Sequence, residues 1–243
     1  MPALHQSYVA DDIFRPYGEK TEGQLRRRLP ALLATLETML SPDIIVIACN
    51  TASTTALKDI RLAVKAPVIG VVPAIKPAAA KTRTGTFAVL GTPGTVKRKY
   101  VDGLITEFAV NKKVILQGSV NLVDMAEAKL MGERVDPQRI KDELSPLFSG
   151  REGANIDVVV LACTHFPLLR EELKKSVTQS VQWIDSGAAI ARRVRNVLLE
   201  KQLSPNQKCP EYETAFLIGP DDEIARRDTF KKFGFLRVVG LMP

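Results

Sequence analysis

Short apolar runs of strand length alternate along the chain with longer amphipathic stretches. Leucines recur at helical spacing over 21–40, Ser41-Pro42-Asp43 then ends this predicted helix, and an apolar run over 44–48 follows as a strand. Alternation of this kind is typical of βα units on a mostly parallel sheet. The pattern therefore predicts an α/β fold.

The same alternation continues to the end of the chain. Further strands are predicted at 68–72, 86–90, 114–116, 158–162, 181–184 and 214–218. Helices are predicted at about 122–131, 136–148, 168–176, 187–201 and 221–233, with a short helix after Pro73 and a basic one after the turn at 91–95. The number of units fits two small α/β halves.

Composition excludes several classes of protein. The 243 residues carry 34 Lys and Arg against 27 Asp and Glu, a net charge of +7, and 45% of them are hydrophobic, which excludes intrinsic disorder. No apolar run approaches the ~20 residues of a membrane-spanning helix. The basic clusters are short and lack interleaved aromatic residues, so they indicate solvated helix faces. We expect neither a membrane nor a nucleic-acid partner.

The N-terminus and the cysteines indicate the compartment. Apart from His5, no basic residue precedes Arg15, and no apolar segment resembling a secretory signal follows Met1. Three cysteines, Cys49, Cys163 and Cys209, are too few for a disulfide framework in a chain of this length. We expect a cytoplasmic protein with reduced thiols.

Two predicted strands end in nearly the same way. Val46-Ile47-Ala48-Cys49-Asn50-Thr51 and Val160-Leu161-Ala162-Cys163-Thr164-His165 align without a gap. Ligands gather at the carboxyl ends of parallel strands, and a helix N-terminus lowers the pKa of a thiol from about 8.5, so either thiol is a candidate base. The alternative is that both cysteines are buried apolar residues. The hydroxyls and the amide that follow them argue for a polar site.

Other chemistries of cysteine find less support. The chain has no paired metal-ligand spacing, no CxxC and no glycine-rich phosphate loop, so we expect no metal and no cofactor. Two equivalent residues suit a reaction that removes a proton from one side of a carbon and returns one to the other. The two cysteines therefore favour cofactor-free stereoinversion.

Four separated motifs resemble those of the glutamate racemase family, within the cofactor-independent aspartate/glutamate racemase superfamily. They are Arg15-Pro16-Tyr17-Gly18-Glu19-Lys20, IIVIACNTASTTAL at 44–57, VLGTPGTV at 89–96 and VVVLACTHFPLL at 158–169. Asp185-Ser186-Gly187 follows in the family's order. The resemblance covers most of the chain.

The resemblance implies two similar small α/β domains with the active site in the cleft between them. The first would comprise residues 1–73 plus 186–243, and the second residues 74–185. It also implies interconversion of L- and D-glutamate, which supplies D-glutamate for peptidoglycan. Cys49 would serve one face of the substrate and Cys163 the other, and His165 would assist the second thiol as proton acceptor or orienter.

Residues that would hold the substrate carry over by motif. They are Tyr17, Gly18, Asn50, Thr51, Thr92, Thr95 and Thr164. Glu127 falls near an acidic position of the family, but we interpret it as a solvated helix glutamate and leave it out of the catalytic set. The resemblance allows a homodimer, although no apolar stripe in the sequence identifies an interface.

The chain departs from the family at its beginning. Family members open with a strand that ends in an Asp-Ser-Gly-rich loop, and no such segment precedes Met1-Pro2-Ala3-Leu4 here. We expect Cys49 to be a weaker base without that aspartate. Two alternatives remain open: a racemase or isomerase of aspartate or another small acid, and a catalytically silent ligand-binding relative.

Overall fold

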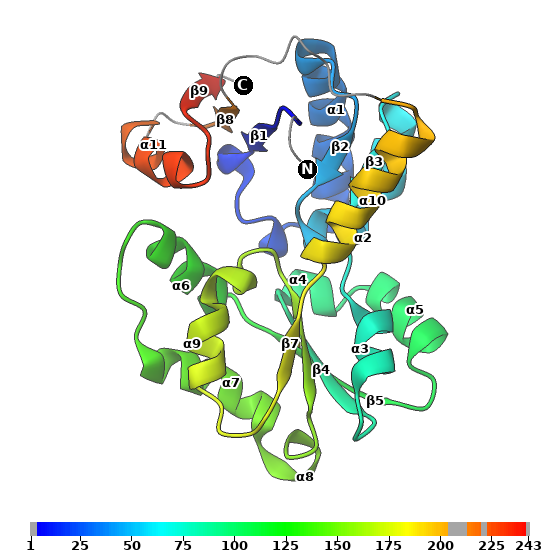
Figure 1. Cartoon of the computed structure of the whole chain (residues 1–243), viewed down its shortest axis with the longest axis vertical. Helices are drawn as coiled ribbons and strands as arrows, with labels where there is room; N and C mark the ends of the chain where they lie inside the picture. Colours follow the sequence, from blue (N-terminus) through cyan, green and yellow to red (C-terminus); the bar gives the residue numbers. More distant parts are fainter. Residues whose placement is uncertain (1–3, 204–212, 220–222, 242–243) are drawn as a thin grey trace. The chain divides into compact units, whose positions relative to one another are not determined.

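The computed structural model describes residues 4–203, 213–219 and 223–241. Packing divides the chain into two compact units, one formed by Met1–Pro16 with Leu198–Pro243 and the other by Tyr17–Val197 (Figure 1). The two domains predicted from the sequence, 1–73 plus 186–243 and 74–185, have other boundaries and stay a prediction. Every predicted site residue belongs to the unit Tyr17–Val197.

A four-stranded parallel sheet forms the centre of this larger unit. Its order is β5 (Lys113–Gly118), β4 (Thr86–Gly91), β6 (Val158–Ala162) and β7 (Gln182–Ile184). All residues of β4 and β6 are buried. Strands covered on both faces have continuous apolar sequences, which is why these two runs were predicted with nearly correct bounds.

Successive residues of the central strands face different helices, because side chains alternate along a strand. Phe87 and Val89 pack with α3 (Ile75–Lys81) and α5 (Lys99–Phe108). Ala88 and Leu90 pack with α6 (Asn121–Leu130), α7 (Pro137–Phe148) and α9 (Arg170–Lys175). The short α8 (Gly150–Gly153) precedes β6. The sheet is therefore covered by helices on both faces.

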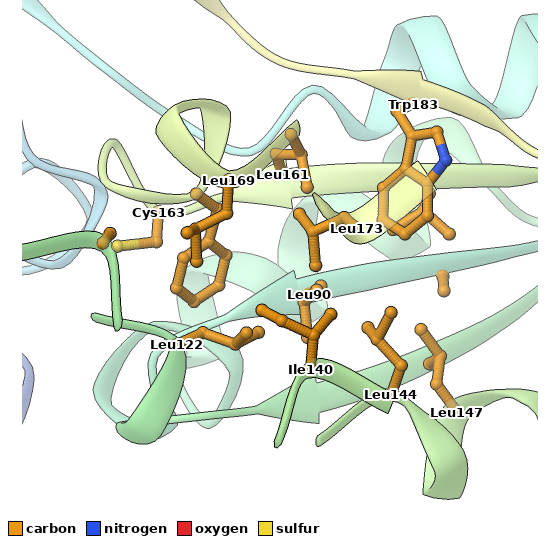
Figure 2. Close-up of a cluster of buried hydrophobic side chains, with 14 of the residues drawn as sticks. Leu90, Leu122, Ile140, Leu144, Leu147, Leu161, Cys163, Leu169, Leu173 and Trp183 are labelled. Atoms are coloured by element: carbon orange, nitrogen blue, oxygen red, sulfur yellow. The ribbon is translucent and has the colours of Figure 1, made fainter. Parts of the chain in front are cut away.

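The second of these faces holds the larger apolar cluster (Figure 2). Cys163 lies at one end of this cluster, next to Leu169 and Leu122, and Leu147 and Trp183 lie toward the other end. The end of β6 thus brings Cys163 to the border between the apolar core and the polar residues that follow.

A two-stranded parallel sheet carries the first cysteine. It consists of β2 (Ile45–Ile47) and β3 (Val68–Gly70), with α1 (Glu22–Leu40) packed against α2 (Asn50–Ala63). Thr21 and Gln24 form a reciprocal capping box at the start of α1, and Ser41 ends the helix in the left-handed region at φ 45°. These local signals explain why the helix was predictable.

The smaller unit has its own three-stranded parallel sheet. Its order is β1 (Ser7–Ala10), β8 (Thr214–Ile218) and β9 (Arg237–Leu241), and α11 (Glu223–Lys232) precedes β9. Tyr8, Phe230 and Phe235 pack their rings together, with centroids 5.5–6.3 Å apart. A short 3₁₀ helix, η1 (Asp12–Phe14), follows β1. Strands β1 and β9 were not predicted from the sequence.

The remaining elements are short or connect the others. They are η2 (Tyr17–Glu19), α4 (Pro93–Val96), η3 (Phe166–Leu169) and α10 (Gly187–Glu200). The helix predicted at 168–176 was wrong in its beginning, because the chain first makes the 3₁₀ turn η3 and only then enters α9. Cys209 and residues 221–222 of the last predicted helix lie outside the described residues.

The prediction of an α/β fold with parallel sheets is confirmed. Among the described residues, none of the helices combines the length and the apolar character needed to cross a bilayer.

Candidate functional site

The two cysteines follow strands but begin different structures. Cys49 follows β2 and is the N-cap of α2, where its Sγ accepts a hydrogen bond from the amide of Ala52 at 3.5 Å. Cys163 follows β6 and precedes the 3₁₀ helix η3. The prediction that both cysteines start helices is thus confirmed for α2 alone, and Cys163 does not cap an α-helix. Both thiols are free.

A hydrogen bond joins the two strand ends. The hydroxyl of Thr164, directly after the second cysteine, donates to the carbonyl of Ala48, directly before the first, at 3.1 Å. Besides burial, electrostatic repulsion from the Cys163 group raises the pKa of Cys49, so the two sulfurs lie within electrostatic reach of each other. The fold therefore brings together two thiols that are 114 positions apart in the sequence.

Cys163 belongs to a chain of three polar groups. Nδ1 of His165 lies 3.7 Å from Sγ of Cys163, and Nε2 of the same ring lies 2.8 Å from Oε1 of Glu127 on α6. The His165 and Glu127 side chains are each 32% exposed. The interpretation of Glu127 as a solvated helix glutamate was wrong, because its carboxylate meets the imidazole that contacts the second thiol.

The surroundings of Cys49 and His165 raise the pKa of each group, which the sequence did not indicate. Burial raises the pKa of Cys49 to about 11, against the hydrogen bond from Ala52. We expected the start of α2 to lower this pKa, and that expectation was wrong because desolvation outweighs the backbone amides. For His165, burial opposes the charged ring, but hydrogen bonds with Cys163 and Glu127 outweigh it and raise the pKa to about 10.

Three threonine hydroxyls meet in a closed triangle. Oγ1 of Thr51 lies 3.0 Å from that of Thr92 and 2.9 Å from that of Thr95, and the last two lie 3.1 Å apart. All three residues are buried. Each hydroxyl has one proton to donate, so a ring of three bonds uses every donor. A ligand carboxylate would have to open this ring to receive a hydrogen bond.

Asn50 directly precedes Thr51 in the sequence and carries a buried amide oxygen, Oδ1. Its side chain is 3% exposed, and among the described residues its Oδ1 has no hydrogen-bond partner. The hydroxyl of Thr55, one turn along α2 from Thr51, is likewise buried without a partner in the part of the chain that the structure describes. A buried acceptor without a partner is costly, and a donor on a bound ligand would satisfy Asn50 Oδ1.

Tyr17 and Gly18 lie against α4. Gly18 faces Thr92 so closely that a Cβ added at Gly18 would lie 3.1 Å from the Thr92 Cβ. A Cβ at Gly94 would overlap the carbonyl of Gly18, so only glycine permits this approach. Arg98 fixes the arrangement, since Nε donates to the Gly94 carbonyl at 2.8 Å and Nη1 pairs with Glu22 at 2.7 Å.

The geometry just described can be compared with known proteins. The sequence model of the Asp/Glu/Hydantoin racemase family matches residues 2–194. The chain belongs to this racemase family.

Named members of the racemase family are similar to the chain over most of its length. The glutamate racemase of Sphingopyxis alaskensis is 48% identical over 197 residues, which are 81% of this chain and 74% of that protein. The glutamate racemase of Vibrio cholerae is 42% identical over 236 residues, or 97% of this chain and 86% of that protein.

Solved structures of the racemase family share the fold. The Escherichia coli glutamate racemase, determined in complex with L-glutamate and the activator UDP-MurNAc-Ala, is 39% identical with a TM-score of 0.91. The match covers 99% of this chain and 90% of that one. A Bacillus anthracis glutamate racemase isoform is 26% identical with a TM-score of 0.80, covering 98% and 87% of the two chains.

The structure groups the site residues predicted from the racemase motifs around the two strand ends and α4. Their roles in catalysis and substrate binding stay predictions. The sequence reasoning left Glu127 out, although it falls near an acidic position of the family, because its partner His165 is 38 positions away in the sequence. Within the ranges that the structure describes, no cluster of three or more His, Cys, Asp or Glu side chains could hold a metal ion.

Proposed function

We propose that the protein is a cofactor-independent racemase that interconverts L- and D-glutamate through Cys49 and Cys163. Similarity to the named glutamate racemases supports the substrate. One observation supports the mechanism above the others: two thiols lie at strand ends joined by a hydrogen bond, and an imidazole contacts one of them.

A racemase that works by two groups needs one acid and one base at the same time. With its pKa raised to about 11, Cys49 keeps its proton at neutral pH and can donate it. His165, whose pKa is raised to about 10, is an imidazolium at neutral pH, and its Nδ1 lies 3.7 Å from Sγ of Cys163. This arrangement favours His165 as an orienting and charge-stabilising group over His165 as a proton acceptor.

The proposed reaction then conserves every proton. The Cys163 thiolate takes the α-proton of glutamate from one face, and the electron pair of the broken C–H bond stays on the substrate as a carbanion. The Cys49 thiol gives its proton to the opposite face, which forms the other enantiomer and leaves a Cys49 thiolate. In the reverse direction the two sulfurs exchange roles.

The polar groups near the thiols match the charged groups of an amino acid. We propose that a substrate carboxylate opens the hydroxyl triangle of Thr51, Thr92 and Thr95, where it receives hydrogen bonds near the start of α2. The substrate ammonium would donate to Asn50 Oδ1, the buried acceptor without a partner among the described residues. Tyr17, Gly18 and Thr164 would complete the site from η2 and the second cysteine loop.

The biological setting proposed here rests on the family resemblance. We propose that the protein acts in the cytoplasm, that its D-glutamate supplies peptidoglycan synthesis, and that it forms a homodimer. Sedimentation of the purified protein measures the last of these directly.

The test of the function follows the optical signal of D-glutamate, and then of L-glutamate, by circular dichroism. Wild-type protein should racemise both enantiomers, and aspartate should react more slowly. Replacement of either Cys49 or Cys163 by Ala should lower the rate by about 10²–10⁴-fold, the contribution of a positioned acid or base. Far-UV spectra check that each variant is folded.

Two results would contradict the proposal. If folded wild-type protein racemises neither amino acid but binds glutamate, and if Cys163→Ala binds it equally well, the protein is a binding relative and not an enzyme. If aspartate reacts faster than glutamate, the assignment of the substrate is wrong.

A further inference from the structure

A lysine ties α6 to the elements that follow the second cysteine. Nζ of Lys129 lies 2.7 Å and 2.9 Å from the two carboxylate oxygens of Glu172, and it donates to the carbonyl of Leu168 at 2.7 Å. Lys129 stands in the last turn of α6 and Glu172 in the first turn of α9 (Figure 1). Each charge therefore sits at the helix end that favours it.

The same lysine is close in sequence to the groups that surround the second thiol. Glu127 lies two positions before Lys129 on α6, and Leu168 lies in η3, three positions after His165. The amide of Leu168 donates to the carbonyl of His165 at 3.0 Å. Helix α6 thus reaches the segment after Cys163 through two polar ties, Glu127 to His165 and Lys129 to Leu168.

Other contacts also hold α6, but they restrain the position of Glu127 less directly than the bonds of Lys129 do. Met125 and Ala126 share the apolar cluster with Phe166 and Leu169, and such contacts are not directional. At the other end of α6, the amide of Leu122 donates to Ser119, whose hydroxyl donates to the carboxylate of Glu143 on α7. The end of α6 that carries Glu127 is the end that Lys129 joins to η3 and α9.

We propose that Lys129 is a positioning residue for the imidazole beside Cys163: by tying α6 to Leu168 and Glu172, it holds Glu127 within hydrogen-bond distance of His165. The proposal rests on the proposed function, in which His165 supports Cys163. Lys129 itself touches none of the reacting atoms and acts through Glu127.

The physical basis is the directionality of the bonds involved. Charge-assisted hydrogen bonds are short and roughly twice as strong as neutral ones, so an ammonium shared by a carboxylate and a carbonyl restrains both. The Glu127 to His165 bond weakens steeply when its length or angle changes. The titratable groups in contact with His165 are Glu127 from α6 and Cys163 from the end of β6. A shift of α6 therefore changes the imidazole directly.

The first measurement uses nuclear magnetic resonance of the histidine rings, because the chain has only two histidines, His5 and His165. A His165→Gln variant assigns the two signals. Lys129→Met should lower the pH at which His165 titrates, since the imidazolium loses part of its bond to Glu127. In Lys129→Arg the titration should stay close to that of the wild type. Lys174→Met is the matched control, because Lys174 pairs with Glu171 on the exposed surface of α9.

The second measurement separates positioning from a general loss of structure. Lys129→Met should lower kcat by about 10-fold with KM nearly unchanged, as expected when a group that orients the reacting sulfur is displaced. In a Glu127→Gln background the same substitution should have no further effect, because Lys129 acts through Glu127. Glu172→Gln should change kcat in the same direction by a smaller factor, and it serves as the test if Lys129→Met does not fold.

Each result decides the proposal. An unchanged His165 titration in Lys129→Met, or an equal fall in kcat with and without Glu127, overturns it. The histidine titration needs no glutamate, so it tests Lys129 even if glutamate is not the substrate. If the wild-type protein does not racemise glutamate but the His165 titration shifts in Lys129→Met, the proposed function is wrong and the positioning role of Lys129 is supported.

Discussion

Single residues decide the chemistry of the two thiols. Cys49 and Cys163 follow similar strand ends, yet Cys49 loses solvation at the start of α2, whereas Cys163 has an imidazole 3.7 Å away. Similar sequences thus produce unlike surroundings. The proposed reaction needs one thiol and one thiolate at a time, and the two sulfurs exchange these roles between the two directions.

The raised pKa of His165 predicts a pH-dependent contribution to stability. The folded-state pKa of about 10 exceeds the ordinary value of about 6.5, so the protonated ring stabilises the folded state fully below about pH 6.5. This contribution is lost as the pH rises through about 10. Urea unfolding should therefore show wild type and His165→Gln furthest apart near about pH 6 and converging near about pH 10.

The other histidine provides the control for this experiment. His5→Gln also removes an imidazole ring, but from the smaller unit, Met1–Pro16 with Leu198–Pro243. A difference in unfolding free energy between wild type and His165→Gln that stays constant with pH would show that the His165 pKa is not raised.

Short elements place the substrate-binding candidates at the scale of secondary structure. Both η2 and α4 have four residues or fewer, and neither has enough internal hydrogen bonds to be stable alone. Their arrangement depends on the absence of a side chain at Gly94 and on the bonds of Arg98 to the Gly94 carbonyl of α4 and to Glu22 in the first turn of α1. A sequence motif reveals the glycine, but not the carbonyl that it accommodates.

Substitution of Gly94 tests this arrangement. In Gly94→Ala the added methyl group meets the backbone of Gly18, and overpacking of this kind costs about 1–3 kcal/mol. Because the strain falls on Tyr17 and Gly18, we expect KM for glutamate to rise by about 10-fold, which corresponds to about 1.4 kcal/mol. Steady-state racemisation kinetics measure this change.

Gly103→Ala is the matched control, since a Cβ at Gly103 has no neighbour within 4 Å and lies inside α5. This substitution should leave KM unchanged and stabilise the protein by about 0.5–1 kcal/mol. An unaltered KM in Gly94→Ala would show that the approach of η2 to α4 does not matter for binding.

The molecule as a whole depends on the buried four-stranded sheet. Strands β4 and β6 have every residue buried, and helices on both faces supply the apolar clusters. Both thiol-bearing strands belong to the unit Tyr17–Val197, so its stability limits the geometry of the candidate site.

A large-to-small substitution in this core should reveal that dependence. Leu144→Ala removes a side chain that is 2% exposed, and such changes cost about 2–5 kcal/mol in unfolding free energy. Leu62→Ala, at a position that is 79% exposed, should change it by less than about 0.5 kcal/mol. Urea denaturation measures the unfolding free energy of both variants. An equal loss in the two would contradict the assignment of Leu144 to the core.

The sequence by itself determined the fold class, most of the strands and the candidate site residues. Periodicity, caps and continuous apolar runs are local signals, so 158–162 and 86–90 could be predicted, and the paired cysteine motifs identified where polar chemistry begins. Strands β1 and β9 were not predicted, and all but one of their residues are exposed or only partly buried.

Only the tertiary structure decided which groups meet and how each is charged. The bond between Glu127 and His165, the bonds of Thr51 to Thr92 and Thr95, and the tie from Lys129 to Glu172 join residues that are 38 to 44 positions apart. The pKa of Cys49 was misjudged for the same reason. A helix start is visible in the sequence, but desolvation depends on the whole surrounding structure.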